Sequence, residues 1–257
     1  MAHSNILVVC EGNSEDKFFK KMGDLFVAKR SIDCYKYNTN LYLLYDELVR
    51  NGIGTDFAKD EFDTLTILKN IARSPEEKEL LSKKFELIYL CFDADFQAEQ
   101  FDKDKIEYML DIFDNDSLQG QIMINYPMFE SLYDTTRYEW ESFQERIVVL
   151  DGLTSATYTA LVSSRGLCSP AKSRCMLYMK EQFLKCLKLN LSKARYLIGV
   201  EKSFDCVQDF YDNITQKAIF ESVLSRVLST RELWVLNTGV FFLVDYVGES
   251  AFENLFY

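Results

Sequence analysis

The first half of the chain alternates between short apolar runs and stretches whose apolar residues recur at helical spacing. The apolar runs have the length of buried strands, and they cover residues 5–10, 32–37, 86–92 and 121–125. Strands that alternate with helices predict a parallel sheet with helices on both faces and right-handed crossovers. The pattern therefore indicates an α/β fold.

Helix signals fill the gaps between these runs. Ser14 is a plausible N-cap for a helix whose stripe begins with Phe18 and Phe19. Helical patterns also cover residues 41–49 and 62–71, and Ser74 to Glu77 read as a capping box with Pro75 at the first helical position. A further helix is expected from the stripe formed by Ile106, Met109, Leu110 and Phe113.

After about Tyr158 the pattern becomes mainly helical. Two apolar stripes fall within residues 176–191 and 219–228, and no Pro/Gly-rich linker separates the two halves of the chain. We therefore expect an α/β domain over residues 1–145 and a mainly helical subdomain over residues 146–257 packed against it. The boundary, between Phe143 and Tyr158, is weakly marked.

Composition removes several classes of chemistry. The 257 residues are 48% hydrophobic and 27% charged, which is typical of a globular chain with a sizeable core. The seven cysteines are scattered without a CxxC pair, so reduced thiols are expected and a zinc site is not. His3 is the only histidine, which argues against Ser-His-Asp, Cys-His and His-metal catalysis.

The start of the chain lacks the basic region and the long apolar run of a signal peptide. The longest late apolar stretch, GVFFLVDYVG, is too short to span a bilayer. We therefore expect a cytoplasmic protein without a membrane partner.

The net charge of −11 argues against a general nucleic-acid coat protein, because such proteins bind by neutralising phosphates. The charge is unevenly spread, however. Residues 172–202 contain eight Lys or Arg and only two Glu. This segment is either a solvated helix face or a basic surface for a phosphate backbone or an acidic partner.

Acidic residues follow three of the expected strands. Glu11 follows the first, Asp93 and Asp95 follow the third, and Glu130 comes shortly after the fourth, while Glu15 lies one helical turn beyond Glu11. In open parallel sheets, ligands bind beyond the carboxyl ends of the strands. Five carboxylates without His or Cys favour an oxygen-ligand site for Mg²⁺ or Mn²⁺.

Each of these residues also has a purely structural interpretation. Glu11 can begin a turn in which Gly12 supplies the backbone freedom. Asp93 and Asp95 can cap the following segment, because Asp favours loops and N-caps. Glu130 can stabilise a helix N-terminus electrostatically, with Pro127 as the first helical residue.

The order of these acidic residues resembles the Toprim domain, which topoisomerases, bacterial primases, small ribosomal-RNA maturation nucleases and OLD (overcoming lysogenization defect) nucleases share. The pair Glu11 and Glu15 is similar to the paired glutamates of OLD-type nucleases, and Asp93 with Asp95 is similar to their DxD motif. Glu130, in NYPMFES, resembles a later acidic residue of OLD-like and RloB-like proteins. The resemblance covers the first half of the chain and looks closest to stand-alone anti-phage Toprim effectors.

The resemblance implies a Toprim-like sheet and a Mg²⁺- or Mn²⁺-dependent endonuclease that cleaves RNA, such as tRNA, or DNA. Glu11, Asp93 and Asp95 would be the main ligands of two cations, and Glu15 and Glu130 would complete the second position or orient a water. Lys172, in SPAKSR, is the candidate for the lysine that OLD-type nucleases use near the site.

Control of such a nuclease is expected from outside the chain. No Walker-type loop occurs in the sequence, so energy-dependent sensing would come from a partner ATPase. Dimerisation of the chain is the second way in which its activity could be controlled. The candidate docking segments are residues 172–202 and the aromatic-rich stretch 241–257, and ordinary core packing is the alternative for the second.

Two other functions stay open. The first is a non-catalytic Toprim-like interaction subunit of a defence complex, which the acidic net charge partly favours. The second is nucleotidyl or phosphoryl transfer as in primases, although neither a nucleotide-binding glycine-rich loop nor an accessory domain is evident.

Overall fold

The structure is a computed structural model that describes residues 5–27, 31–51, 62–114, 119–136, 139–164, 177–201, 204 and 206–247. The chain divides into two compact units. The first unit comprises Met1–Phe92 and Gln100–Met123, and the second comprises Asp93–Glu99 and Ile124–Tyr257. Residues 124–145, which we expected in the first domain, cluster with the second unit, and the domain limits drawn from the sequence stay a prediction.

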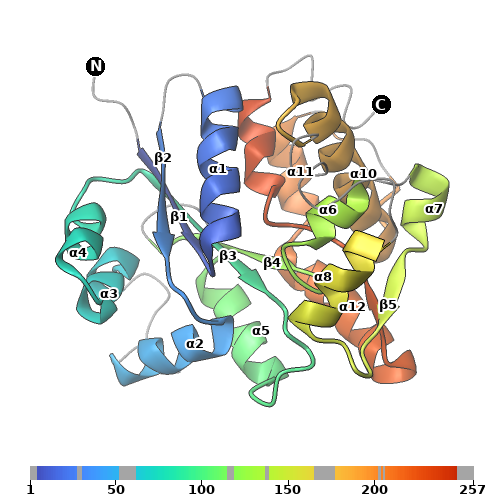
Figure 1. Cartoon of the computed structure of the whole chain (residues 1–257), viewed down its shortest axis with the longest axis horizontal. Helices are drawn as coiled ribbons and strands as arrows, with labels where there is room; N and C mark the ends of the chain where they lie inside the picture. The colour runs from blue at the N-terminus through green and yellow to red at the C-terminus, as the bar shows by residue number, and fades with distance from the viewer. Residues whose placement is uncertain are drawn as a thin grey trace. The chain divides into compact units, whose positions relative to one another are not determined.

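A four-stranded parallel sheet forms the core of the first unit (Figure 1). Its strand order is β2-β1-β3-β4. The bounds are β1 (Asn5–Cys10), β2 (Ser31–Lys36), β3 (Leu87–Asp93) and β4 (Gln121–Asn125). β1 pairs in parallel with both β2 and β3, and Cys10 lies opposite Lys36 on one side and Cys91 on the other. The expected strands and the parallel sheet are confirmed.

Helices flank this sheet. They are α1 (Asn13–Phe26), α2 (Leu41–Arg50), α3 (Thr64–Ile71), α4 (Pro75–Leu81) and α5 (Lys103–Ile112). The apolar residues of α1 are buried, as the helical stripe predicted. The α/β class is therefore confirmed.

Two of these helix starts differ in detail from expectation. α1 begins at Asn13, and its N-cap is Gly12 in an extended conformation, so the assignment of Ser14 as N-cap is wrong. At α4 the Ser74 side chain accepts a hydrogen bond from the Glu77 amide, as expected. The Glu77 carboxylate, however, accepts from the amide of Arg73 instead of completing the box at Ser74.

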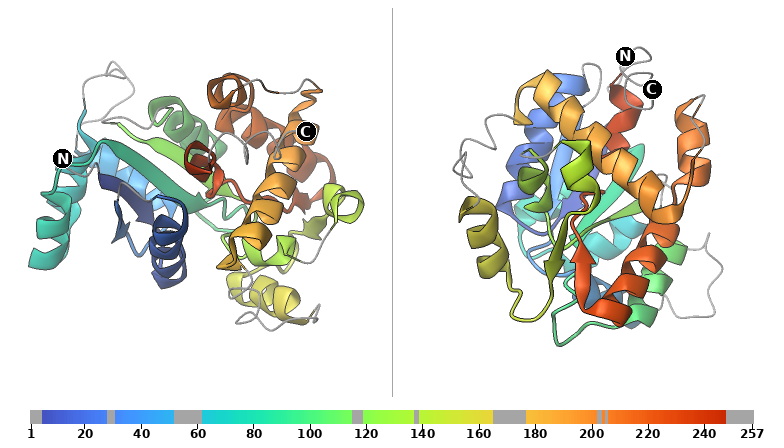
Figure 2. Two further views of the ribbon diagram at one scale, coloured as in Figure 1. Left: turned by 90° about the horizontal axis from the view of Figure 1, so that it is seen from above. Right: turned by 90° about the vertical axis from the view of Figure 1, so that its right-hand side faces the viewer.

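The second unit is mainly helical (Figure 2). It contains α6 (Ser131–Thr135), α7 (Trp140–Gln144), α8 (Ser155–Ser164), α10 (Lys180–Ile198), α11 (Val207–Asn213), α12 (Gln216–Thr230) and η1 (Phe241–Tyr246). α10 packs against α6, α7 and α12. In the described part of the aromatic-rich stretch, Phe241 to Val244 and Val247 are buried, whereas Asp245 is exposed. Most of this part is therefore core, and residues 248–257 lie outside the described residues.

The second unit also contains a short antiparallel pair that the sequence did not predict. β5 (Ile147–Val149) pairs with β6 (Glu232–Trp234), and Val148 lies opposite Leu233. In the described part of the chain, none of the helices combines the length and the apolar character needed to cross a bilayer.

Candidate functional site

The turn after β1 holds the two candidate glutamates of the first unit. The carbonyl of Glu11 accepts a hydrogen bond from the Asn38 amide at 3.0 Å, which ties the end of β1 to the segment after β2. Gly12 then starts α1, and its carbonyl accepts from the Asp16 amide at 3.3 Å. Glu15 falls in the first turn of α1 with its side chain buried. A carboxylate at this position also stabilises the helix N-terminus, so the structural interpretation stays open.

Asp93 is the last residue of β3, and Asp95 lies two positions beyond it; both belong to the second unit. The amide of Ala94, between them, donates to the carbonyl of Asn125 at 3.0 Å. Asp95 adopts a left-handed conformation with φ of 42°, which Asp tolerates better than most residues. Its carboxylate accepts a hydrogen bond from the Gln97 amide group at 3.0 Å. Burial raises the pKa of Asp95, and the hydrogen bond from Gln97 opposes that shift.

Asn125, the last residue of β4, orients Asp93 and was not flagged by the sequence. Its side-chain Nδ2 lies 3.3 Å from Asp93 Oδ1, and its Oδ1 accepts from the Gly239 amide at 3.0 Å. The Asn125 side chain is buried, and a Cβ added at Gly239 would lie only 2.9 Å from Asn125 Oδ1. The second unit therefore orients the Asp93 carboxylate through a buried amide that is itself hydrogen-bonded to Gly239.

The segment around Gly239 is itself anchored to the end of β4. Tyr126 and Leu236 exchange two backbone hydrogen bonds of 2.8 Å, and the Thr238 hydroxyl donates to the carbonyl of Ile124 at 2.8 Å. These contacts set the position of the Gly239 amide.

Glu130 is the N-cap of α6, and its side chain makes no capping hydrogen bond. Its carbonyl accepts from the amides of Tyr133 and Asp134 at 3.0 and 3.1 Å. Pro127 lies ahead of this helix, after a cis Tyr126–Pro127 peptide bond. The interpretation of Pro127 as the first helical residue is therefore wrong.

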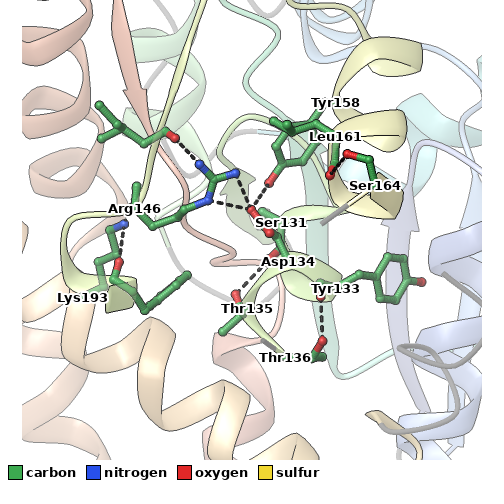
Figure 3. Close-up of polar contacts among 12 residues, drawn as sticks. Ser131, Tyr133, Asp134, Thr135, Thr136, Arg146, Tyr158, Leu161, Ser164 and Lys193 are labelled. Atoms are coloured by element: carbon green, nitrogen blue, oxygen red, sulfur yellow. Dashed lines mark hydrogen bonds and ion pairs between the residues drawn. The ribbon is translucent and has the colours of Figure 1, made fainter. Parts of the chain in front are cut away.

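A second group of polar side chains in the second unit, Asp134, Arg146, Tyr158 and Lys193, is buried (Figure 3). Arg146 makes two contacts with Asp134 Oδ2, at 3.0 Å from Nε and 2.9 Å from Nη2, and the Tyr158 hydroxyl donates to the same oxygen at 3.4 Å. Lys193 Nζ donates to the carbonyls of Phe143 at 2.9 Å and Arg146 at 2.7 Å.

Lys193 belongs to the segment for which we considered a basic surface, but its side chain is fully buried. Burial, together with the nearby Arg146 charge, lowers the pKa of Lys193 to about 6. This part of the basic-surface interpretation is therefore wrong, because Lys193 is a core residue. Asp134, Arg146, Tyr158 and Lys193 together form a polar network inside the second unit.

The candidate acids divide between the two units. Glu11 and Glu15 belong to the first unit, and Asp93, Asp95 and Glu130 to the second. Along the chain, Glu11 comes one position after Cys10 and Asp93 two positions after Cys91, and these cysteines are paired neighbours in the sheet.

Among the residues that the structure describes, no three His, Cys, Asp or Glu side chains are grouped closely enough to hold a metal ion. Lys172 lies outside the described residues.

Comparison with family models, curated proteins and solved structures finds no match to this chain.

Proposed function

We propose that the chain is a Mg²⁺- or Mn²⁺-dependent nuclease that hydrolyses phosphodiester bonds in RNA or DNA. The observation that carries the proposal is the pairing of β1 with β3, because Glu11 directly follows one strand and Asp93 ends the other. In parallel sheets, chemistry is concentrated beyond the carboxyl ends of such neighbouring strands.

The donor chemistry of the candidate acids fits a hard cation. Glu11, Glu15, Asp93, Asp95 and Glu130 offer only carboxylate oxygens, the ligands that Mg²⁺ and Mn²⁺ prefer. Bringing these carboxylates together around two cations is part of the proposal. Bound cations would supply an activated water and would stabilise the leaving oxygen.

The chain's own residues would position and support that chemistry. Asn125 donates a hydrogen bond to one oxygen of Asp93 at 3.3 Å, which restrains the direction of this carboxylate. Asp95 has a left-handed backbone conformation, and its carboxylate is held by a hydrogen bond from Gln97 at 3.0 Å. Lys172 is proposed as the cation that offsets charge developing on the scissile phosphate.

We further propose that the protein is a toxic effector of a bacterial anti-phage defence system. The resemblance of its acidic motifs to stand-alone Toprim effectors supports this role. Control would then come from a partner ATPase or from the protein's own dimer, as the absence of a Walker-type loop in the sequence suggests.

A second function, a non-catalytic interaction subunit, is favoured by one observation. The described acidic side chains do not form a group of three or more that could hold a metal ion. Such a subunit would bind its partner and would neither bind Mg²⁺ or Mn²⁺ nor cleave nucleic acid.

Cleavage assays on total cellular tRNA and on plasmid DNA with Mg²⁺ or Mn²⁺ separate these functions. We expect wild-type protein to shorten one of the substrates, and Glu11→Gln or the Asp93→Asn/Asp95→Asn double variant to abolish cleavage. Glu79→Gln, at an exposed position of α4, is the matched control and should cleave like wild type. Cleavage by Glu11→Gln at the wild-type rate would show that the site is wrongly assigned.

A further inference from the structure

A surface pocket between α7 and α10 lies entirely within the second unit. Its volume is about 360 Å³, which falls in the range of small-molecule sites, about 300–1,000 Å³. The pocket is lined by Glu139, Trp140, Lys185, Lys188, Leu189 and Ser192.

α10 contributes a polar wall with an apolar base. Lys185, Lys188 and Ser192 are three and four residues apart, so they project from one face of the helix. Leu189 lies among them and is only 7% exposed. The face thus presents two cationic side chains and a hydroxyl above an apolar surface.

α7 contributes an aromatic ring that is held in place from one side. Trp140 is partly exposed, and its ring contacts Tyr196 edge to face, with centroids 6.3 Å apart. Tyr196 in turn contacts Trp234 edge to face at 6.4 Å, and its hydroxyl donates to Glu145 at 3.0 Å. This chain of rings restrains the Trp140 side chain.

An exposed ion pair joins two of the residues that line the pocket. Lys185 Nζ lies 2.5 Å from Glu139 Oε1, and the two side chains are 44% and 75% exposed. Ion pairs with this exposure contribute little to stability, so an incoming anion can exchange with the Glu139 carboxylate.

We propose that this pocket binds one nucleotide of a single-stranded nucleic acid, with the base stacked on Trp140 and the phosphates bound by Lys185 and Lys188. Sites for single strands combine aromatic stacking platforms with cationic side chains that follow the backbone. The two lysines of the pocket belong to a chain of net charge −11, so their positive charge opposes the overall field. Bases of a duplex are already stacked on each other and cannot reach Trp140.

That the bound single-stranded nucleic acid is a substrate rests on the proposed nuclease function. Its binding to the pocket does not depend on that function. Binding is therefore measured with a chelator present, by fluorescence anisotropy of a labelled short oligouridylate. Lys185→Gln/Lys188→Gln should weaken binding and make the log–log salt dependence shallower by about 1.4, twice the value of about 0.7 per single-strand phosphate contact. Lys69→Gln/Lys78→Gln, on α3 and α4, removes the same charge elsewhere and should bind like wild type.

The aromatic part has its own test. Trp140→Leu should weaken binding about fivefold or more, and Trp140→Phe should retain most of the affinity because a ring remains. Glu139→Gln should strengthen binding by removing the competing carboxylate. Tryptophan fluorescence should be quenched by the strand in wild type and unaffected in Trp140→Phe, because Trp234 is buried. Equal unfolding midpoints of the variants and wild type provide the folding control.

Two further probes identify the ligand class. An abasic strand and polyglutamate should both bind more weakly than oligouridylate. If either binds as tightly, with the same dependence on Lys185 and Lys188, the pocket is a general anion site or an acidic-peptide site and the proposal is overturned. An unchanged affinity in Trp140→Leu would overturn it as well.

The results also distinguish this proposal from the nuclease function. If wild-type protein binds the oligonucleotide through Trp140 but never cleaves nucleic acid, the nuclease function is contradicted and the pocket proposal is supported. Protein that cleaves normally, with strand binding unchanged in every pocket variant, would support the nuclease function and contradict the pocket.

Discussion

Removal of the Asp134 carboxylate should destabilise the second unit strongly. Asp134 is fully buried and Arg146 is 8% exposed, and two guanidinium contacts of 2.9 and 3.0 Å meet one carboxylate oxygen. Asp134→Ala would leave the guanidinium buried without its anion. The loss of one partner from a buried ion pair costs about 3–5 kcal/mol.

Removal of both charges should cost less than removal of one. The Asp134→Leu/Arg146→Met double variant replaces the pair with apolar side chains, an exchange that is often neutral or stabilising by about 1–4 kcal/mol. Tyr158→Phe should have a small effect, about 1 kcal/mol or less, because its hydrogen bond to Asp134 is long at 3.4 Å. We therefore expect Asp134→Ala to have the lowest free energy of unfolding of the three variants.

Urea unfolding followed by tryptophan fluorescence measures these free energies, because Trp140 and Trp234 both belong to the second unit. A loss of about 4 kcal/mol at a slope of about 2 kcal/mol per molar urea lowers the midpoint by about 2 M. A midpoint for Asp134→Ala within about 0.3 M of wild type, at an unchanged slope, would refute the reasoning. A double variant less stable than Asp134→Ala would refute it equally.

Three other positions give distinct expectations. The pKa of lysine in an unfolded chain is about 10.4, whereas the pKa of Lys193 in the folded protein is about 6. Between these pH values the unfolded state binds more protons than the folded state. The contribution of Lys193 to the free energy of unfolding therefore rises by about 1.4 kcal/mol per pH unit. Lys193→Met should therefore lose about 3 kcal/mol of the stability gain that wild type shows from pH 7 to pH 9, and identical pH profiles in urea unfolding would contradict this. Gly239→Ala places a methyl group 2.9 Å from Asn125 Oδ1, so it should displace the amide that holds Asp93 and slow cleavage. Asn125→Asp should have the same effect, because a carboxylate cannot donate to Asp93, and normal cleavage by both variants would exclude this positioning role.

The strands of the first unit were predictable because burial on both faces of a parallel sheet imposes continuous apolar sequence. Residues 6–10 are fully buried, and their continuous run of aliphatic residues and cysteine is the pattern expected of such a strand. The start of α1 was less predictable. Ser14 matches the usual N-cap preference, but the chain uses Gly12, whose extended backbone lets the helix begin immediately after the turn.

The β5–β6 pair could not be predicted because it lacks a local signal. Each strand has three residues, too few to show a period of two, and the partners are separated by more than eighty positions. Pairing of this kind depends on tertiary contacts that a single sequence does not display.

The candidate acids were found by their charge at strand ends, but their supporting residues were not. Asn125 is a neutral amide at the end of a strand, and only its contacts with Asp93 and Gly239 give it a role. Lys193 was misjudged for a different reason. A lysine among other basic residues is expected to be exposed, but the Lys193 side chain is buried in the core. Burial of polar side chains depends on long-range packing, which charge patterning cannot reveal.

The most direct measurement of the central claim is a Mn²⁺ titration of the full chain, by calorimetry and by electron paramagnetic resonance of the free ion. We predict saturable binding in the millimolar range or tighter, weakened at least about tenfold in Asp93→Asn/Asp95→Asn, since removal of metal-ligand carboxylates reduces charge and donor number. Asp104→Asn, whose side chain is 80% exposed on α5, should bind Mn²⁺ like wild type. Wild-type protein without a saturable site, or equal affinity in wild type and Asp93→Asn/Asp95→Asn, would contradict a metal site at these carboxylates.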